Sequence, residues 1–214
     1  MDASFWHQRW ETNNIGFHRA DTNPMLVKHF EALSLDKGSR VFLPLCGKTL
    51  DIGWLLSAGF RVAGAELSEL AITQLFRDLG IKPNISQHDK VIHYSADTID
   101  IYVGDLFHMS SDLLGPVDAI YDRAALVALP EDMRSRYTTH LRTITDHVPQ
   151  LLICFEYDQT QMEGPPFSVS DEEVKQHYRD SYELTLLECF DIEGGLKGKC
   201  EATESVWLLE NPKE

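Results

Sequence analysis

Residues 40–67, RVFLPLCGKTLDIGWLLSAGFRVAGAEL, give the clearest indication of the fold. It contains two short apolar runs, 40–47 and 60–67, on either side of a helical pattern at 49–58. Short apolar runs bounded by turn residues are typical of buried strands. A strand, a helix and a second strand in this order predict a unit whose two strands lie parallel in one sheet.

Strands and helices continue to alternate on both sides of this unit. Helices are expected at 3–13, 23–34, 49–58, 69–80, 130–147 and 170–181, and strands at 40–47, 60–67, 91–96, 99–107, 150–158, 183–192 and 203–210. Residues 117–126 are expected to form a further strand followed by the start of a helix. This alternation predicts a three-layer α/β fold with a mostly parallel sheet and an antiparallel pair at the C-terminal end. Because no linker, repeat or low-complexity stretch interrupts the chain, residues 1–214 are predicted to form one domain.

Composition and charge narrow the class of protein. Nineteen basic and 34 acidic residues give a net charge of −15, which argues against a surface that binds nucleic acid. No apolar run approaches the roughly 20 residues of a membrane-spanning helix, and the N-terminal sequence does not resemble a secretory signal. The four cysteines show no metal-binding spacing and are expected to be free thiols. We therefore expect a cytoplasmic protein that acts on small molecules.

In α/β folds the ligand lies beyond the carboxyl ends of the strands, so the strand ends are the first places to look for a site. The first strand ends in Pro-Leu-Cys-Gly-Lys-Thr (44–49), which lacks the glycine pattern of a dinucleotide-binding loop and of a phosphate-binding P-loop. The second ends in Glu66, where a carboxylate can accept hydrogen bonds from both ribose hydroxyls. S-Adenosylmethionine carries such a diol without a pyrophosphate. Alternatively, Glu66 caps the following helix or faces water.

Two further strand ends carry polar residues. Asp105 could border an adenine ring, although Gly-Asp is also a common turn pair. Arg123 could meet a carboxylate or a substrate, or it could form a salt bridge with Asp122 or Glu156.

The N-terminal helix places Trp6 and Trp10 one turn apart on the same face. Such a stripe usually packs a helix onto its sheet, but aromatic rings can also cover a sulfonium cation. The sequence contains no HExxH metal motif and no GxSxG nucleophile motif, so neither a metal site nor a serine hydrolase is expected.

Taken together, these segments resemble the thiopurine S-methyltransferases, in their bacterial form. The matching segments are WHQRWETNNIGFH (6–18), NPMLVKHF (23–30), VFLPLCGKTLDIGWLLSAGFRVAGAELSELAI (41–72), YDRAALVALP (121–130) and YDQTQMEGPPFSVS (157–170). The resemblance implies a Rossmann-like class I methyltransferase fold. It also implies methyl transfer from S-adenosyl-L-methionine to the sulfur of an aromatic or heterocyclic thiol such as 6-mercaptopurine.

The same resemblance assigns roles to individual residues. It implies that the cofactor is bound by Trp10, Leu45, Glu66, Asp105, Leu106 and Arg123, and the thiol by Phe17 and Arg123. No dedicated catalytic base and no metal are expected, because orientation of the two reactants is the main requirement. Residues 1–35 are predicted to form a helical cap over a Rossmann-like core of residues 36–214, with 3–22 acting as a lid on a monomer.

Three other functions remain open at this stage. The first is a methyltransferase for halide, small thiol, selenium or tellurium acceptors. The second is an NAD-binding oxidoreductase, and the third is a binding protein without turnover. Mammalian members of the family carry a second substrate-side arginine near the C-terminus, whereas this sequence has Lys197 and Lys199 there.

Overall fold

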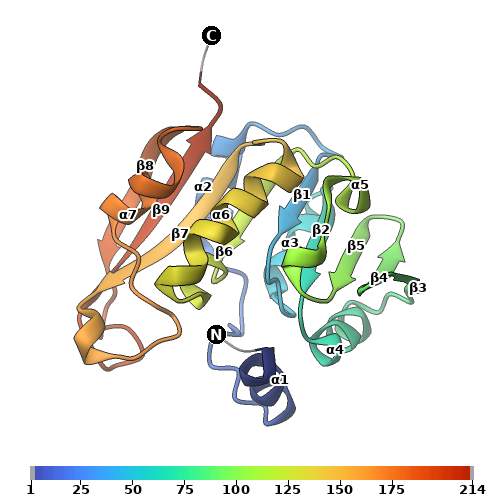
Figure 1. The fold of residues 1–214 in the computed structure, drawn as a ribbon, viewed down its shortest axis with the longest axis horizontal. Helices are drawn as coiled ribbons and strands as arrows, with labels where there is room; N and C mark the ends of the chain where they lie inside the picture. Colours follow the sequence, from blue (N-terminus) through green and yellow to red (C-terminus); the bar gives the residue numbers. More distant parts are fainter. Residues whose placement is uncertain (1–2, 213–214) are drawn as a thin grey trace. The chain divides into compact units, whose positions relative to one another are not determined.

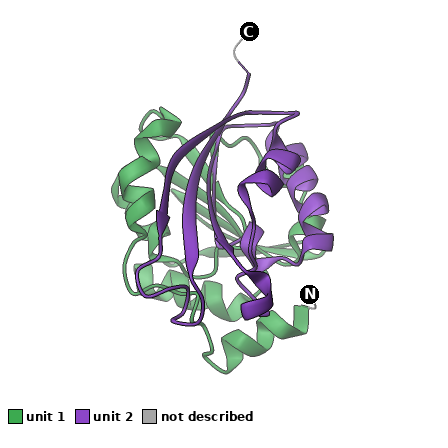
Figure 2. Ribbon diagram, turned by 90° about the vertical axis from the view of Figure 1, so that its left-hand side faces the viewer, with its two compact units in different colours: residues 1–119 green, residues 120–214 purple. Residues whose placement is uncertain are grey.

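The structure is a computed structural model that describes residues 3–212. The chain forms two compact units, residues 1–119 (unit 1) and 120–214 (unit 2), which Figure 2 shows in different colours. Each unit is described by itself.

Unit 1 contributes five strands, together with helices that flank them (Figure 1). Its elements are α1 (Ala3–Glu11), α2 (Pro24–His29), η1 (Phe30–Leu33), β1 (Arg40–Leu43), α3 (Leu50–Ser57), β2 (Arg61–Glu66), α4 (Glu69–Leu79), β3 (Asn84–His88), β4 (Val91–Ala96), β5 (Ile99–Val103), η2 (Leu106–His108) and α5 (Ser111–Leu114). The strand order is β3-β4-β5-β2-β1. The β1–β2 and β2–β5 pairs are parallel, whereas β3–β4 and β4–β5 are antiparallel.

The strand–helix–strand unit predicted from 40–67 is confirmed. All four residues of β1 are buried, as are Val62–Glu66 of β2, which explains the continuous apolar runs. The helix ends follow local capping chemistry. Thr49 and Ser68 accept backbone N–H bonds at the starts of α3 and α4, and Gly80 ends α4 in the left-handed conformation.

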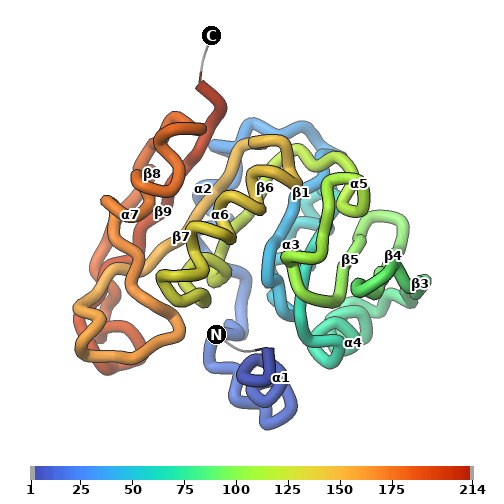
Figure 3. Tube along the Cα trace, viewed as in Figure 1, coloured from blue at the N-terminus to red at the C-terminus, as the bar shows by residue number. Residues whose placement is uncertain are grey.

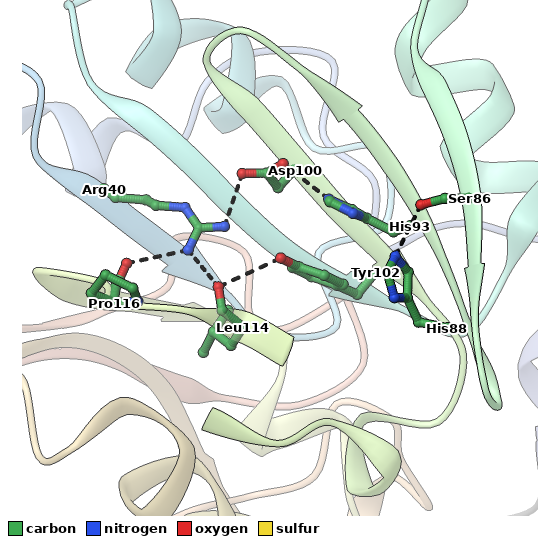
Figure 4. A network of polar contacts seen from close by, with 8 residues as sticks. All are labelled: Arg40, Ser86, His88, His93, Asp100, Tyr102, Leu114 and Pro116. Carbon is green, nitrogen blue, oxygen red and sulfur yellow. Dashed lines mark hydrogen bonds and ion pairs between the residues drawn. The ribbon is translucent and has the colours of Figure 1, made fainter. Parts of the chain in front are cut away.

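A polar network closes the amino-terminal end of this sheet (Figure 4). The buried Arg40 guanidinium lies 2.9 Å from the Asp100 carboxylate and donates to the Leu114 carbonyl at 2.6 Å. His93 Nε2 lies 2.9 Å from the second Asp100 oxygen, and its ring stacks on Tyr102 at a centroid distance of 4.5 Å. The network therefore joins β1, β4 and β5 at the end opposite the strand ends that the sequence singled out.

Unit 2 contains four strands and the helices that pack on them. Its elements are β6 (Ala119–Arg123), η3 (Leu126–Ala128), α6 (Glu131–Thr145), β7 (Gln150–Tyr157), η4 (Gln159–Gln161), α7 (Asp171–Tyr178), β8 (Glu183–Asp191) and β9 (Ala202–Glu210). The order is β6-β7-β9-β8, with β6–β7 parallel and the pairs β7–β9 and β8–β9 antiparallel. The predicted C-terminal antiparallel pair is thus confirmed. Helices α6 and α7 lie on one face of these strands (Figure 2).

The structure differs from the sequence prediction in a few elements. Strand β3 was not predicted, and the strand expected at 99–107 ends at Val103, where the chain turns into η2. Cys46, Cys154 and Cys200 are buried free thiols, whereas Cys189 is exposed. Within residues 3–212, no helix is long and apolar enough to cross a membrane.

Candidate active site

The loop after β1 curls tightly at the carboxyl end of the unit 1 sheet. Leu45 and Gly47 have φ angles of 47° and 54°, the left-handed conformation that turns the chain back on itself. The Cys46 N–H donates to the Ala65 carbonyl at 2.9 Å, which fastens the loop to β2. Because the loop and β2 are tied together, the backbone amide of Gly47 faces the end of β2.

Glu66, the last residue of β2, is held by that loop. Its Oε2 accepts from the Gly47 N–H at 2.8 Å, and its Oε1 accepts from the Ser68 N–H at 2.9 Å. The side chain is only 6% exposed, which excludes the alternative that it faces water. The helix cap is Ser68, whose hydroxyl accepts from Ala71, so Glu66 does not cap α4 either.

The chemistry of this carboxylate fits a ribose diol. Burial raises the pKa of Glu66, while the amides of Ser68, Gly47 and Leu67 counteract that rise. Each carboxylate oxygen has a second lone pair beyond the one that its amide uses. Two oxygens fixed in direction by backbone amides could therefore accept from two neighbouring hydroxyls.

Trp10 covers this loop from the N-terminal helix. A Cβ on Gly47 would lie 3.0 Å from Trp10 Cζ2, so the indole packs directly on the Gly47 backbone. Trp10 is buried and meets the Phe17 ring edge-to-face at 5.5 Å, and Trp6 meets the same ring at 5.7 Å. The tube in Figure 3 shows the irregular segment after α1 that carries Phe17. Trp10 thus lies on the PLCGK loop, and Phe17 and then Trp6 extend an aromatic cluster away from it.

The end of β5 joins the same group of residues. The Gly104 N–H donates to the Glu66 carbonyl at 2.9 Å, which places Asp105 and Leu106 just beyond the end of β2. Asp105 is exposed and its carboxylate accepts from the Phe107 N–H at 3.0 Å, whereas Leu106 is buried. The structure therefore brings six of the seven predicted residues together in unit 1: Phe17, Trp10, Leu45, Glu66, Asp105 and Leu106.

Cys46 is the sulfur that lies within this loop. Its side chain packs on β2, where a Cβ on Gly64 would lie 2.9 Å from Cys46 Sγ. Burial and the negative charge of Glu66 hold the pKa of the Cys46 thiol well above its usual value. The thiol is neutral at physiological pH and is not an activated nucleophile.

Arg123 belongs to unit 2, where it is the last residue of β6 and is half-buried. Among the described residues it forms no ion pair with Asp122 or Glu156. The Asp122 carboxylate instead accepts from the Tyr137 hydroxyl at 2.7 Å and the Leu126 N–H at 3.1 Å. The salt-bridge interpretation is therefore wrong for the described part of the chain.

Two buried carboxylates shape these segments in ways that the sequence did not predict. Asp51 in α3 accepts from the Asn23 N–H at 2.7 Å, and both residues are 1% exposed, so the N-terminal segment is fastened to α3. Asp122 is the second. Its signal in the sequence is an acidic residue directly after a run of buried strand residues, Ala119–Tyr121, a position where a carboxylate needs several donors.

Comparison with known proteins covers almost the whole chain. The family model for thiopurine S-methyltransferase matches residues 1–211. The chain is 54% identical to the thiopurine S-methyltransferase of Xanthobacter autotrophicus over 211 residues, covering 98% of this chain and 99% of the relative. It is 52% identical to that of Teredinibacter turnerae over 209 residues, covering 98% and 97%.

Solved structures agree in fold at much lower identity. The S-adenosylmethionine-dependent methyltransferase of Anabaena variabilis matches with a TM-score of 0.66 at 14% identity, covering 98% of this chain and 95% of that one. The 1,6-didemethyltoxoflavin-N1-methyltransferase of Burkholderia thailandensis, solved with S-adenosylhomocysteine, matches with a TM-score of 0.66 at 14% identity, covering 98% and 87%. These matches show the Rossmann-like fold of such methyltransferases.

Proposed function

The chain belongs to the thiopurine S-methyltransferase family, and from this we propose that it methylates the sulfur of an aromatic or heterocyclic thiol such as 6-mercaptopurine. The methyl donor is S-adenosyl-L-methionine, and the second product is S-adenosyl-L-homocysteine. The observation that carries the proposal is the Glu66 carboxylate, fixed by the amides of Gly47 and Ser68 at the end of β2.

We assign cofactor binding to the residues gathered at the strand ends of unit 1. Glu66 would accept from the ribose hydroxyls, since a carboxylate in this place suits a diol. Asp105 and Leu106 would border the adenine. Trp10 and the left-handed turn at Leu45 would enclose the methionine part, where an indole face favours a sulfonium cation.

The remaining residues would serve the acceptor. Phe17 lies against Trp10 and would pack on the aromatic thiol, while Arg123 would contact the cofactor and the thiol. When bound, the cofactor supplies an electrophilic methyl group; the thiolate sulfur forms the new C–S bond as the old C–S bond breaks. Heteroaromatic thiols ionise readily, so the protein needs mainly to orient the two reactants, an effect on the order of 7–11 kcal/mol in favourable cases.

The test is methyl transfer from isotopically labelled S-adenosylmethionine to 6-mercaptopurine, with Glu66→Ala and a reaction without thiol as controls. We expect thiol-dependent label transfer by the wild type and a higher KM for the cofactor in Glu66→Ala. If no methyl transfer is observed, calorimetric titration with S-adenosylhomocysteine distinguishes between two explanations. Binding without turnover would favour an acceptor of another kind, such as a small thiol, halide, or selenium or tellurium nucleophile. Absence of binding would overturn the proposal.

We further infer a monomer of one domain that acts in the cytoplasm and binds no nucleic acid. The net charge of −15 favours mutual repulsion of copies and of nucleic acid, and four free thiols suit a reducing compartment. A role in metalloid detoxification would follow only from activity on selenium or tellurium acceptors. Light scattering coupled to gel filtration tests the monomer, for which a mass near 24.4 kDa is expected.

A further inference from the structure

Asp122 occupies an unusual position beside the proposed binding residue Arg123. It is fully buried in β6, in a run of apolar residues, and its side chain points back at the chain that follows Arg123. Oδ1 accepts from the Leu126 N–H at 3.1 Å, and the Ala125 N–H also bonds to the carboxylate. Oδ2 accepts from the Tyr137 hydroxyl of α6 at 2.7 Å. Three donors therefore converge on one carboxylate.

These bonds span a turn that contains Arg123. The turn runs from Asp122 to Leu126, and Ala124 inside it has a φ of 62°, a conformation that L-residues other than glycine seldom adopt. Such a conformation persists only where the surroundings enforce it. Here the Asp122 side chain, at the start of the turn, bonds to Ala125 and Leu126 at its end, so it fixes the direction in which the chain leaves Arg123.

We propose that Asp122 is a positioning residue, whose carboxylate holds the turn that aims the Arg123 guanidinium at the cofactor and the thiol. The inference rests on the proposed function, because that function gives Arg123 its role. Asp122 itself touches neither reactant. It acts by keeping the turn closed. The ionised form binds all three donors most strongly, because protonation turns one oxygen into a donor and weakens both as acceptors.

The surroundings of Asp122 make this arrangement sensitive to pH. Burial raises the pKa of Asp122 to about 6, although the bonds from Tyr137, Leu126 and Ala125 counteract the rise. Tyr137 of α6, Tyr178 of α7 and Cys154 of β7 interact with Asp122, and their pKa values are well above the usual range. These three groups therefore stay neutral between pH 5 and 8.

A charged group also lies nearby on the same helices. Arg134 of α6 lies 2.8 Å from the Glu173 carboxylate of α7, which also bonds to His177 at 3.2 Å. Arg134, Glu173 and Asp171 act electrostatically on Cys154. Because His177 is bonded to the Glu173 carboxylate of this group, His177→Gln is the matched control for any pH effect assigned to Asp122.

The first experiment observes Arg123 directly, without ligand. The Arg123 Nε–Hε cross-peak is assigned in the ¹⁵N spectrum by its loss in Arg123→Lys and is followed from pH 5 to 8. We expect it to shift or broaden as the pH falls through the Asp122 titration, and to lose this dependence in Asp122→Asn. An Arg123 cross-peak whose position and width change neither with pH nor with the Asp122 substitution would overturn the inference.

The second experiment measures the affinity for S-adenosylhomocysteine by calorimetry across the same pH range. We expect the wild-type affinity to fall about tenfold toward pH 5, and Asp122→Asn to bind weakly at every pH. Tyr137→Phe removes one hydrogen-bond donor to Asp122, which should move the pH at which affinity falls to a higher value. This second variant also tests the inference if Asp122→Asn does not fold. His177→Gln should retain the wild-type curve.

The outcomes separate the inference from the proposed function. A wild type that binds the ligand, together with an unchanged transition in Tyr137→Phe, overturns the role of Asp122 and leaves the function standing. A wild type that binds no ligand at any pH contradicts the proposed function, while the Arg123 cross-peak still decides whether Asp122 positions the turn.

Discussion

Gly47 illustrates how one residue can hold a site together by having no side chain. Its φ is 54°, and a Cβ there would lie 3.0 Å from Trp10 Cζ2. We expect Gly47→Ala to destabilise the protein by about 1–3 kcal/mol, because it combines left-handed strain with a clash against a buried indole. Denaturant unfolding followed by tryptophan fluorescence measures the loss and reports any displacement of Trp10.

Gly53 provides the matched control. It lies within α3, where a Cβ would meet only the Leu79 side chain at 3.6 Å, an ordinary contact distance. Gly53→Ala should therefore leave stability unchanged or raise it by about 0.5–1 kcal/mol, since alanine favours a helix interior. Equal losses in both variants would contradict the role assigned to the contact between Gly47 and Trp10.

Glu66 leads to the second prediction. In Glu66→Gln one carboxylate oxygen becomes an NH₂ group, which cannot accept from the Gly47 or Ser68 amide. The affinity for S-adenosylhomocysteine should fall about ten- to a hundredfold, because both the anchoring amide and a ribose hydroxyl lose an acceptor.

Calorimetry of Glu66→Gln is best compared with Glu69→Gln. Glu69 is an exposed carboxylate of α4 that bonds to the Tyr94 hydroxyl at 2.6 Å. Its substitution should leave cofactor affinity at the wild-type level. Wild-type affinity in Glu66→Gln would show that the ribose lies elsewhere.

For these residues, the sequence predicts the residue types but not their immediate partners. Glu66 could be identified because a carboxylate after the second strand has a limited set of uses. Its bonds to Gly47 and Ser68 could not, since they depend on the left-handed turn at Leu45, where the sequence shows an ordinary leucine. The contact of Trp10 with Gly47 likewise joins segments that only the fold brings together.

Among the elements, the N-terminal segment is the one expected to close over the candidate site. Helix α1 buries only Trp10, and it contacts α4 (Figure 1). We predict that residues 3–22 act as a lid: S-adenosylhomocysteine should protect this segment from limited proteolysis. The site of cleavage is read by mass spectrometry. Cleavage at the same rate with and without the ligand would contradict the lid, and Trp10→Ala should abolish the protection. Residues 1–2 of the predicted cap lie outside the described residues.

The elements also show where sequence periodicity stops being informative. Helices α4 and α7 were predictable because Ser68 and Ser170 precede them and cap them. Strand β3 was not, since all five of its residues are exposed and its sequence NISQH carries no apolar alternation. It exists because its backbone pairs with β4, an interaction that side-chain pattern does not encode.

For the molecule as a whole, the buried Asp122 and the half-buried Asp100 should influence stability in opposite directions with pH. The pKa of Asp122 is raised to about 6, so between pH 4 and 6 the folded state holds a proton that the unfolded chain has released. Stability from this group is therefore lost as the pH rises through 6. Relative to Asp122→Asn, the wild type should lose about 3 kcal/mol between pH 4 and 8, measured by denaturant unfolding. A constant difference would contradict the raised pKa.

Asp100 should act in the reverse sense. Burial alone would raise its pKa, but the hydrogen bond from His93 and the charge of Arg40 lower it below the usual value. Its contribution to stability is present above pH 4 and is lost as the pH falls through the lowered pKa. The stability deficit of Asp100→Asn should thus be full at pH 7 and shrink in strong acid. A stability deficit that does not change with pH would show that the charge of Asp100 does not contribute to the stabilising effect of the network in Figure 4.

The raised pKa of Asp122 also bears on its proposed function. The form of Asp122 that binds all three donors most strongly is the ionised form, and ionisation is also what lowers the stability of the fold. Selection for activity near neutral pH would therefore retain a residue that stability alone would replace by an apolar one.

The state of Cys46 has a consequence for the lifetime of such a protein. An alkylating agent held in a pocket reacts with whichever sulfur is ionised, whether it belongs to the substrate or to the wall. Burial and the neighbouring Glu66 charge keep the Cys46 thiol protonated, so this sulfur does not react with the methyl donor. Glu66, the carboxylate assigned to bind S-adenosyl-L-methionine, would thereby also protect the protein from methylation of its own cysteine during repeated turnover.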